Sequence, residues 1–166
     1  MPEPQNRSNT GATASPSSLS PLTKIFGSAL YSGFSPVASG TAGSFVGLLI
    51  YFLPSFEKIY IILPLSCFIL VLGAFAAEKM EAVYGSDPRQ VTIDELLGMW
   101  VSLIFLQKTI PIAALAFVIF RILDIVKPWP ASLFDKRNGG WNIMLDDVVA
   151  GIYTNLLLQI GIYFFS

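Results

Sequence analysis

Long apolar runs separated by short polar segments organise this sequence. Charged residues are sparse, and five uncharged runs follow one another: 25–56, 59–77, 96–107, 109–120 and 148–166. The second and the last run each hold 19 residues. A helix of that length, rising about 1.5 Å per residue, matches a hydrocarbon core of about 30 Å. The pattern therefore predicts helices that cross a membrane.

The third and fourth runs are shorter, with 12 residues each. A helix of 12 residues covers only about 18 Å. These elements can span a membrane only by drawing in charged neighbours, which are Asp94 and Glu95 on one and Arg121 and Asp124 on the other. We expect these charges to lie near the lipid headgroups.

The first apolar run is interrupted by small and helix-breaking residues, namely Gly33, Pro36, Gly40 and Gly43. This spacing indicates a re-entrant or looped piece, followed by a helix over about 44–53. The predicted fold is all-α: a compact multi-helix integral membrane bundle with a re-entrant or looped Gly-rich N-terminal segment.

The first 22 residues differ from the rest of the chain in composition. They are rich in Pro, Ser, Thr and Asn and poor in large apolar side chains, so they cannot offset the entropy lost on ordering. No apolar segment typical of a secretory signal follows Arg7. We predict a disordered tail over 1–22 and one helical membrane domain over 23–166.

Composition agrees with a membrane environment. The chain is 54% hydrophobic and 13% charged, with a mean hydropathy of +0.65, which is more apolar than a soluble domain. The net charge of -1 gives no attraction to nucleic acid, so no nucleic-acid partner is expected. Histidine is absent, which excludes imidazole chemistry. Cys67, within an apolar stretch, is interpreted as a buried, inert thiol.

Threading the runs through a membrane places the loops 35–44, 78–95 and 127–147 on one side. The turns 54–58 and 107–111 then lie on the other side. Lys and Arg residues favour the first side, which has Arg7, Lys24, Lys79, Arg89, Lys127, Lys136 and Arg137 against Lys58 and Lys108 opposite. The positive-inside rule makes the first side cytoplasmic.

Nine of the eleven carboxylates belong to the same side, with only Glu3 and Glu57 elsewhere. Three groups stand out: Asp87 with Asp94 and Glu95, Arg121 with Asp124 and Lys127, and Asp146 with Asp147. Carboxylates from separate segments suit a hard cation such as Mg²⁺, and the lack of His disfavours zinc. The candidate metal ligands are Asp94, Glu95, Asp146 and Asp147.

Cations and small residues on this side suit a phosphate. Arg121 and Asp124 share a helix face, and Lys127 precedes Pro128, which turns it into the loop. Arg121 and Lys127 could therefore converge on a headgroup phosphate. Backbone N–H groups at a helix start could cradle the same anion; the candidates are Gly40, Thr41, Gly43 and Ser44.

Each feature also has a purely structural interpretation. Thr92 and Glu95 fit a capping box, Asp146 and Asp147 could be helix-start acids, and Arg121 with Asp124 could be a structural ion pair. The glycine-rich segment could be a turn and cap. Trp129 and Trp141 are expected to be interfacial anchors, and Lys136 and Arg137 exposed loop charges.

Several ordered motifs between about residues 31 and 158 resemble the phosphatidylglycerophosphatase A family. The segments that carry the resemblance are Phe34-Ser35-Pro36, Gly40-Thr41-Ala42-Gly43-Ser44, Asp94-Glu95-Leu96-Leu97-Gly98-Met99-Trp100, Phe120-Arg121-Ile122-Leu123-Asp124, Lys127-Pro128-Trp129-Pro130 and Asp146-Asp147-Val148-Val149-Ala150-Gly151. The resemblance implies an all-helical fold, Mg²⁺ dependence, and hydrolysis of phosphatidylglycerophosphate to phosphatidylglycerol and phosphate at the bacterial inner membrane.

The resulting hypothesis assigns roles to the charged groups. Asp94, Glu95, Asp146 and Asp147 hold Mg²⁺, Asp124 joins them or orients Arg121, and Arg121 with Lys127 clamps the terminal phosphate. Either water or a carboxylate makes the attack. Two other classes of function also use acids within a helical bundle: a small divalent-cation transporter, with acids near the midplane, and a non-catalytic membrane assembly protein.

Overall fold

The computed structural model describes residues 19–165, and the regular elements within them are all helical. The all-α prediction is confirmed. The helices are α1 (Pro21–Gly27), a 3-10 helix η2 (Ser32–Phe34), α2 (Ser39–Tyr51), α3 (Ile59–Tyr84), α4 (Ile93–Leu103), α5 (Ile110–Val126), α6 (Ala131–Asp135) and α7 (Gly140–Phe165).

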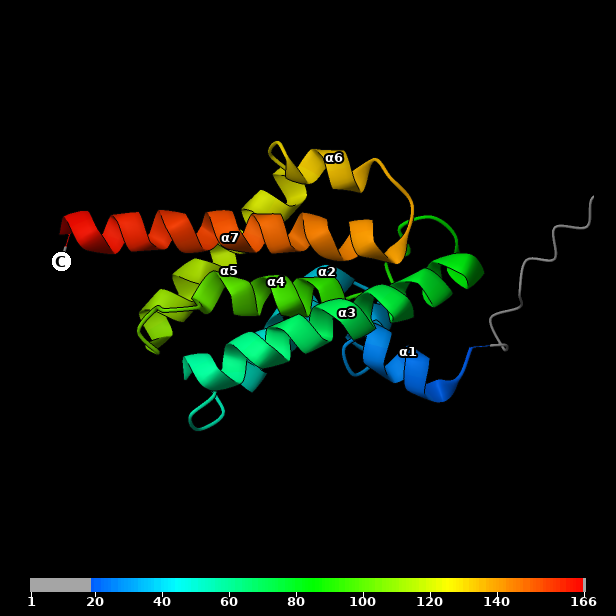
Figure 1. The fold of residues 1–166 in the computed structure, drawn as a ribbon, viewed down its shortest axis with the longest axis horizontal. Helices are drawn as coiled ribbons and strands as arrows, with labels where there is room; N and C mark the ends of the chain where they lie inside the picture. Colours follow the sequence, from blue (N-terminus) through cyan, green and yellow to red (C-terminus); the bar gives the residue numbers. More distant parts are fainter. Residues whose placement is uncertain (1–18, 166) are drawn as a thin grey trace, which may run out of the picture.

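The short helix α4 forms the centre of the bundle. It contacts α2, α3, α5 and α7, and α7 runs along the length of the molecule beside it (Figure 1). Leu97, Met99 and Leu103 of α4 are among the largest fully buried side chains. With 11 residues, α4 is too short to span a membrane by itself.

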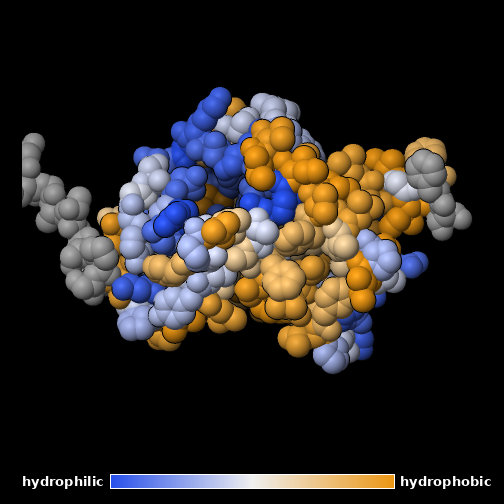
Figure 2. All heavy atoms as spheres, turned by 180° about the vertical axis from the view of Figure 1, so that it is seen from behind, coloured by the Kyte–Doolittle hydropathy of each residue, from blue (hydrophilic) through white to orange (hydrophobic). Residues whose placement is uncertain are grey.

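The long helices α3 and α7 have 26 residues each. Both are long and apolar enough to cross a membrane. Large apolar side chains on their outer faces are exposed, among them Phe68, Phe75 and Ile160. On the face shown in Figure 2, hydrophobic residues cover the part nearer the C-terminus and hydrophilic residues gather toward the other end. This distribution is that of a helical membrane bundle.

The glycine-rich segment is more helical than predicted. The looped part covers only 28–38, and α2 begins at Ser39 rather than near Ser44. The glycines here serve close packing: a Cβ on Gly43 would lie 2.7 Å from Thr92 Cβ, and one on Gly47 would lie 2.9 Å from the Leu96 carbonyl oxygen. Small residues let helices approach closely in membranes, and this packing offsets the poor helix propensity of glycine.

Two predicted loops are also shorter than expected. Helix α3 continues to Tyr84 and ends at Gly85, whose φ of 100° only glycine adopts easily. Helix α7 already begins at Gly140, so that Asp146 and Asp147 are helical. A helix can continue through polar residues after its apolar part ends. The ends of uncharged runs therefore do not mark the ends of helices.

The two turns predicted opposite these loops do lie together. The Lys108 ammonium donates hydrogen bonds to the Leu53 carbonyl oxygen at 2.5 Å and to Glu57 Oε2 at 2.7 Å. Cys67, in contrast, is exposed. The interpretation as a buried thiol is wrong because Cys67 lies on the outer face of α3, whereas Ile62, Ser66 and Ile69 of the same stretch are buried.

The predicted tail falls mostly outside the described residues. Residues 1–18 are not among them. Pro21 and Leu22 form the start of α1, where the Ser20 hydroxyl accepts a hydrogen bond from the Thr23 N–H. The last two residues of the predicted tail are therefore helical.

Candidate active site

A polar cavity of about 280 Å³ lies where α2 and α4 begin and α5 ends. It gathers side chains from segments far apart in the chain. Its charged lining residues are Asp87, Arg89, Asp94, Glu95, Arg121, Asp124, Lys127, Asp146 and Asp147. The predicted grouping of these residues at one end of the bundle is what the structure shows.

Three carboxylates form the core of the cavity. One oxygen each of Asp94, Glu95 and Asp147 lies within 4.8 Å of the others. Asp94 and Glu95 occupy the first turn of α4, and Asp147 lies on α7. Asp94 and Asp147 are buried, with 8% and 3% exposure, so that few water molecules screen their mutual repulsion.

The two helices meet closely enough for this because both carry glycine at the contact. A Cβ on Gly151 of α7 would lie 2.5 Å from the Gly98 carbonyl oxygen, and a Cβ on Gly98 would lie 2.8 Å from the Asp147 carbonyl oxygen. Two glycines at one crossing let backbones approach directly. The Gly98–Gly151 contact thus lets α7 approach α4 closely enough to bring the carboxylates together.

The carboxylate group has free ligand atoms. Glu95 Oε2 and Asp147 Oδ2 are buried and have no hydrogen-bond partner among the described residues. Buried oxygens without a partner are costly. A hard divalent cation would satisfy both, and oxygen ligands without His or Cys fit Mg²⁺ better than zinc.

Arg121 faces the carboxylates from α5. Its guanidinium bonds Asp124 Oδ2 at 2.6 Å and the Ser44 hydroxyl at 3.4 Å, while its buried Nε has no partner in the described part of the chain. Ser44 in turn donates to the Gly40 carbonyl oxygen at 2.9 Å. Arg121 and Asp124 do form the ion pair anticipated as a structural alternative, and the pair lines the cavity.

Lys127 closes the same end of the cavity. It follows the last residue of α5 and has a left-handed conformation with φ 47°, so the helix stops before Pro128 as expected. Its ammonium donates to Asp146 Oδ2 at 2.6 Å and also to Asp135. Burial by itself lowers the pKa of Lys127, but the hydrogen bonds to Asp135 and Asp146 outweigh burial and raise it. Asp135 and Asp146 therefore favour the charged form of Lys127.

Asp146 and Asp147 have different surroundings. Asp147 belongs to the three-carboxylate group, whereas Asp146 is held by Lys127 and lies outside that group. Both residues lie well inside α7, so the interpretation of them as helix-start acids is wrong. Neighbouring residues on a helix point about 100° apart, and α7 therefore presents one carboxylate to α4 and the other to Lys127.

The predicted phosphate cradle lies partly at the cavity. Of the four candidates only Gly40 lines it, together with Ala38 and Ser39 at the start of α2. Gly43 instead packs on Thr92, and Thr41 is not among the lining residues. The cavity thus meets the N-terminus of α2, where unpaired N–H groups favour an anion.

The capping-box interpretation of Thr92 and Glu95 is wrong. Helix α4 has no side-chain cap, and the Thr92 hydroxyl lies 2.9 Å from the Ser32 hydroxyl instead. Lys136 and Arg137 are exposed as expected. Arg89 lines the cavity but was predicted only as one charge of a loop; its place beside Asp87 is the signal that could have revealed it.

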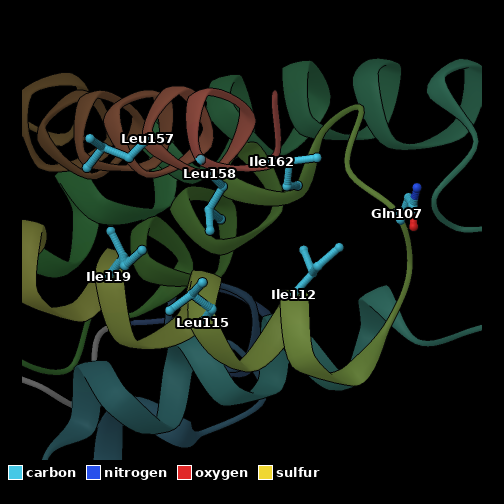
Figure 3. A pocket seen from close by; sticks show the side chains of 8 residues that line it. Gln107, Ile112, Leu115, Ile119, Leu157, Leu158 and Ile162 are labelled. Atoms are coloured by element: carbon cyan, nitrogen blue, oxygen red, sulfur yellow. The ribbon is translucent and has the colours of Figure 1, made fainter. Parts of the chain in front are cut away.

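A larger cleft of about 510 Å³ lies between α5 and α7. Aliphatic side chains from the two helices point toward one another across it, with Gln107 at one end (Figure 3). Its lining has no charged residue. Of these two cavities, the smaller one is the one with charged side chains in its lining.

Comparisons with known proteins show the family of the chain. The sequence model described as Phosphatidylglycerophosphatase A matches residues 25–162. The chain belongs to the phosphatidylglycerophosphatase A family. The matched range contains every charged residue that lines the polar cavity, and this family is one of phosphatases.

Three relatives extend over most of the chain. A protein of Bacteroides thetaiotaomicron with the provisional name phosphatidylinositol-3-phosphatase is 35% identical over 84% of this chain and 93% of its own length. Phosphatidylglycerophosphatase A of Escherichia coli K12 is 36% identical, over 81% of this chain and 77% of its own. The Haemophilus influenzae enzyme of the same name is 32% identical, over 80% and 82%. No solved structure matches the chain.

Proposed function

We propose that this protein hydrolyses the terminal phosphate of phosphatidylglycerophosphate, giving phosphatidylglycerol and inorganic phosphate for phospholipid biosynthesis. The proposal rests on one observation: acidic and basic side chains line the same small cavity. Asp94, Glu95 and Asp147 form a metal-sized group, and Arg121 and Lys127 line the same cavity.

Mg²⁺ is the cofactor that these residues fit best. Asp94, Glu95 and Asp147 would hold it, with Asp146 close by on α7. When bound, the ion neutralises phosphate charge and lowers the pKa of an attacking water. The partnerless oxygens of Glu95 and Asp147 support this assignment.

The cations of α5 bind and orient the phosphate. Arg121 is held by Asp124 and Ser44 but keeps its Nε free for an acceptor. Phosphate oxygens accept from a guanidinium in two parallel bonds, which fixes the direction of the scissile bond. The start of α2 adds N–H groups on the same side of the cavity.

Two lines of attack fit these residues. In one, water adds to phosphorus and the lipid alkoxide leaves and takes a proton. In the other, a carboxylate attacks, the lipid leaves, and water then cleaves the acyl phosphate. In both, positioning and charge neutralisation supply most of the acceleration.

The place of the acids favours an enzyme over a cation transporter. Asp94 and Glu95 occupy the first turn of α4, and Arg121 and Asp124 lie in the last turns of α5. A transporter needs acids near the midplane, whereas a lipid phosphatase needs them at a headgroup boundary. From the excess of Lys and Arg at this end we assign it to the cytoplasmic face of a bacterial inner membrane.

The test is phosphate release by purified protein from phosphatidylglycerophosphate in mixed micelles, with Mg²⁺ and with EDTA. Because one relative has a provisional inositide name, phosphatidylinositol-3-phosphate is the second substrate. We expect Mg²⁺-dependent release that is faster from phosphatidylglycerophosphate. Phosphate release only from phosphatidylinositol-3-phosphate would show that the inositide, and not phosphatidylglycerophosphate, is the substrate. No release from either lipid would contradict the proposed function.

A further inference from the structure

Two glutamates of α3 hold the start of α7 by its backbone. Glu81 Oε2 accepts a hydrogen bond from the Gly139 N–H at 2.8 Å, and Glu78 Oε2 accepts one from the Gly140 N–H at 2.6 Å. Glu78 and Glu81 are three residues apart and share a face of α3. Helices α2 to α6 begin without a side-chain cap, so α7 is unlike them in being held by carboxylates of another helix.

The contact is too close for any residue but glycine. Gly139 has φ 112°, and a Cβ on Gly140 would lie 1.9 Å from the Ala74 carbonyl oxygen and 2.6 Å from the Glu78 nitrogen. The start of α7 is therefore pressed directly on the backbone of α3, and its N–H groups reach both carboxylates.

The same contact continues along α7 toward the cavity. Met144, which is fully buried, fills the space left by Gly73: a Cβ there would lie 2.6 Å from Met144 Cε. Asp147 follows Gly140 by seven residues, close to two turns or about 10.5 Å, and so lies on nearly the same face. Glu81 also lines a small cavity of about 10 Å³ together with Asp146.

We propose that Glu78 and Glu81 are positioning residues for the active site, fixing the height and rotation of α7 so that Asp147 meets Asp94 and Glu95. Neither glutamate lines the polar cavity, so their effect passes through α7. The catalytic part of the inference rests on the proposed hydrolysis, while the effect on the cation site does not.

The test compares Glu81→Ala and Glu78→Ala with Glu81→Gln and Glu78→Gln. Glutamine keeps an oxygen that accepts the backbone N–H, whereas alanine removes it. Partners behind metal ligands typically change metal affinity or activity by about 10–100-fold. We expect each alanine variant to lower kcat and to raise the Mg²⁺ concentration for half-maximal activity by about ten-fold, and each glutamine variant to stay within about three-fold of wild type.

KM for the lipid should change less than kcat, because Arg121 is held by Asp124 on α5 and Ser44 on α2 and does not depend on α7. A merely structural role would lower the amount of folded protein without this split between kcat and KM. Glu57→Ala is the matched control, since it removes a carboxylate that bonds Lys108 far from the cavity; its kinetics should equal those of wild type.

A second readout needs no hydrolysis. Mg²⁺ that binds the folded state raises Tm, and this rise should be smaller in the alanine variants than in wild type and in the glutamine variants. If the wild type releases no phosphate but its Tm still rises with Mg²⁺, the proposed hydrolysis is wrong while the positioning role remains supported. Wild-type kcat and Mg²⁺ response in both alanine variants, or equal losses in alanine and glutamine variants, would overturn the positioning role.

Discussion

Gly40 of α2 passes directly beside Glu95 of α4. A Cβ on Gly40 would lie 2.4 Å from Glu95 Oε1 and 2.9 Å from one terminal nitrogen of Arg121. The missing side chain thus leaves room for two charged groups, one expected to bind metal and one to bind phosphate. Glycine at this position serves the chemistry of the cavity more than the conformation of the backbone.

Gly40→Ala should therefore reduce activity more than stability. The added methyl group meets only the ends of flexible side chains, which can move aside, but this movement shifts the carboxylate and the guanidinium. We expect activity to fall by about 10–100-fold while Tm changes little. Gly43→Ala is the contrast, because its Cβ would meet Thr92 Cβ at 2.7 Å and the Thr92 carbonyl oxygen at 2.8 Å and should lower Tm. Equal kinetics in wild type and Gly40→Ala would contradict this view.

Asp147→Asn and Asp94→Asn remove one negative charge each from the three-carboxylate group. We expect phosphate release to fall by at least about 100-fold, in the range for loss of a key electrostatic group. Without metal, both variants should melt at higher temperature than wild type, because buried like charges within 4.8 Å repel one another. The rise of Tm with Mg²⁺ should disappear. Unchanged rates in both variants would remove the site assignment.

The pattern of polarity predicted the bundle and the gathering of charges well. Charged residues at the ends of apolar runs must lie near headgroups, and alternation of the runs places Asp94, Arg121 and Asp147 at the same end. The side of the membrane on which each loop lies depends only on the order of apolar and polar segments, and this order can be read directly from the sequence.

What the sequence did not determine is the rotation of each helix. Whether Asp146 or Asp147 faces α4 depends on the Gly98–Gly151 contact, which is long-range in the chain. The same holds for the glycine-rich segment: Gly43 and Gly47 are typical of a loop until α4 packs on them. Cys67 was misassigned because an apolar stretch in a membrane protein can face lipid as readily as the core.

The Gly98–Gly151 contact itself predicts a stability effect. A Cβ on Gly151 would lie 2.5 Å from a backbone oxygen, which cannot move without separating α4 from α7. We expect Gly151→Ala to cost about 1–3 kcal/mol of unfolding free energy. Gly161→Ala on the same helix is the control, since its Cβ meets nothing within 4 Å and alanine favours helix by up to about 1 kcal/mol. Denaturation in detergent should give a lower unfolding free energy for Gly151→Ala than for wild type, and a higher one for Gly161→Ala.

The Glu57–Lys108 pair predicts a pH dependence of stability. The hydrogen bond from Lys108 lowers the pKa of Glu57 below its ordinary value of 4.5. A carboxyl with a lowered pKa in the folded state contributes stability above its unfolded pKa, and this contribution is lost as pH falls through the folded pKa. The Tm difference between wild type and Glu57→Gln should be small, since the pair lies in a surface turn and is partly exposed, and should shrink below pH 4.5. A difference that grows on acidification would contradict the assignment.

Loss of Lys127 should reduce activity more than loss of its partner Asp135. It bonds Asp135, whose side chain is 35% exposed, and Asp146, whose side chain is 8% exposed, so its loss leaves a buried carboxylate without a cation. Asparagine tolerates the left-handed conformation of this position, and Lys127→Asn therefore changes the charge with little strain. We expect kcat/KM for the lipid to fall by about 100-fold, partly restored in Lys127→Arg. Asp135→Asn, which keeps the bond to Asp146, should lose less than about three-fold. Similar losses in Lys127→Asn and Asp135→Asn would mean that Lys127 only fastens α6, and that Arg121 binds the phosphate without it.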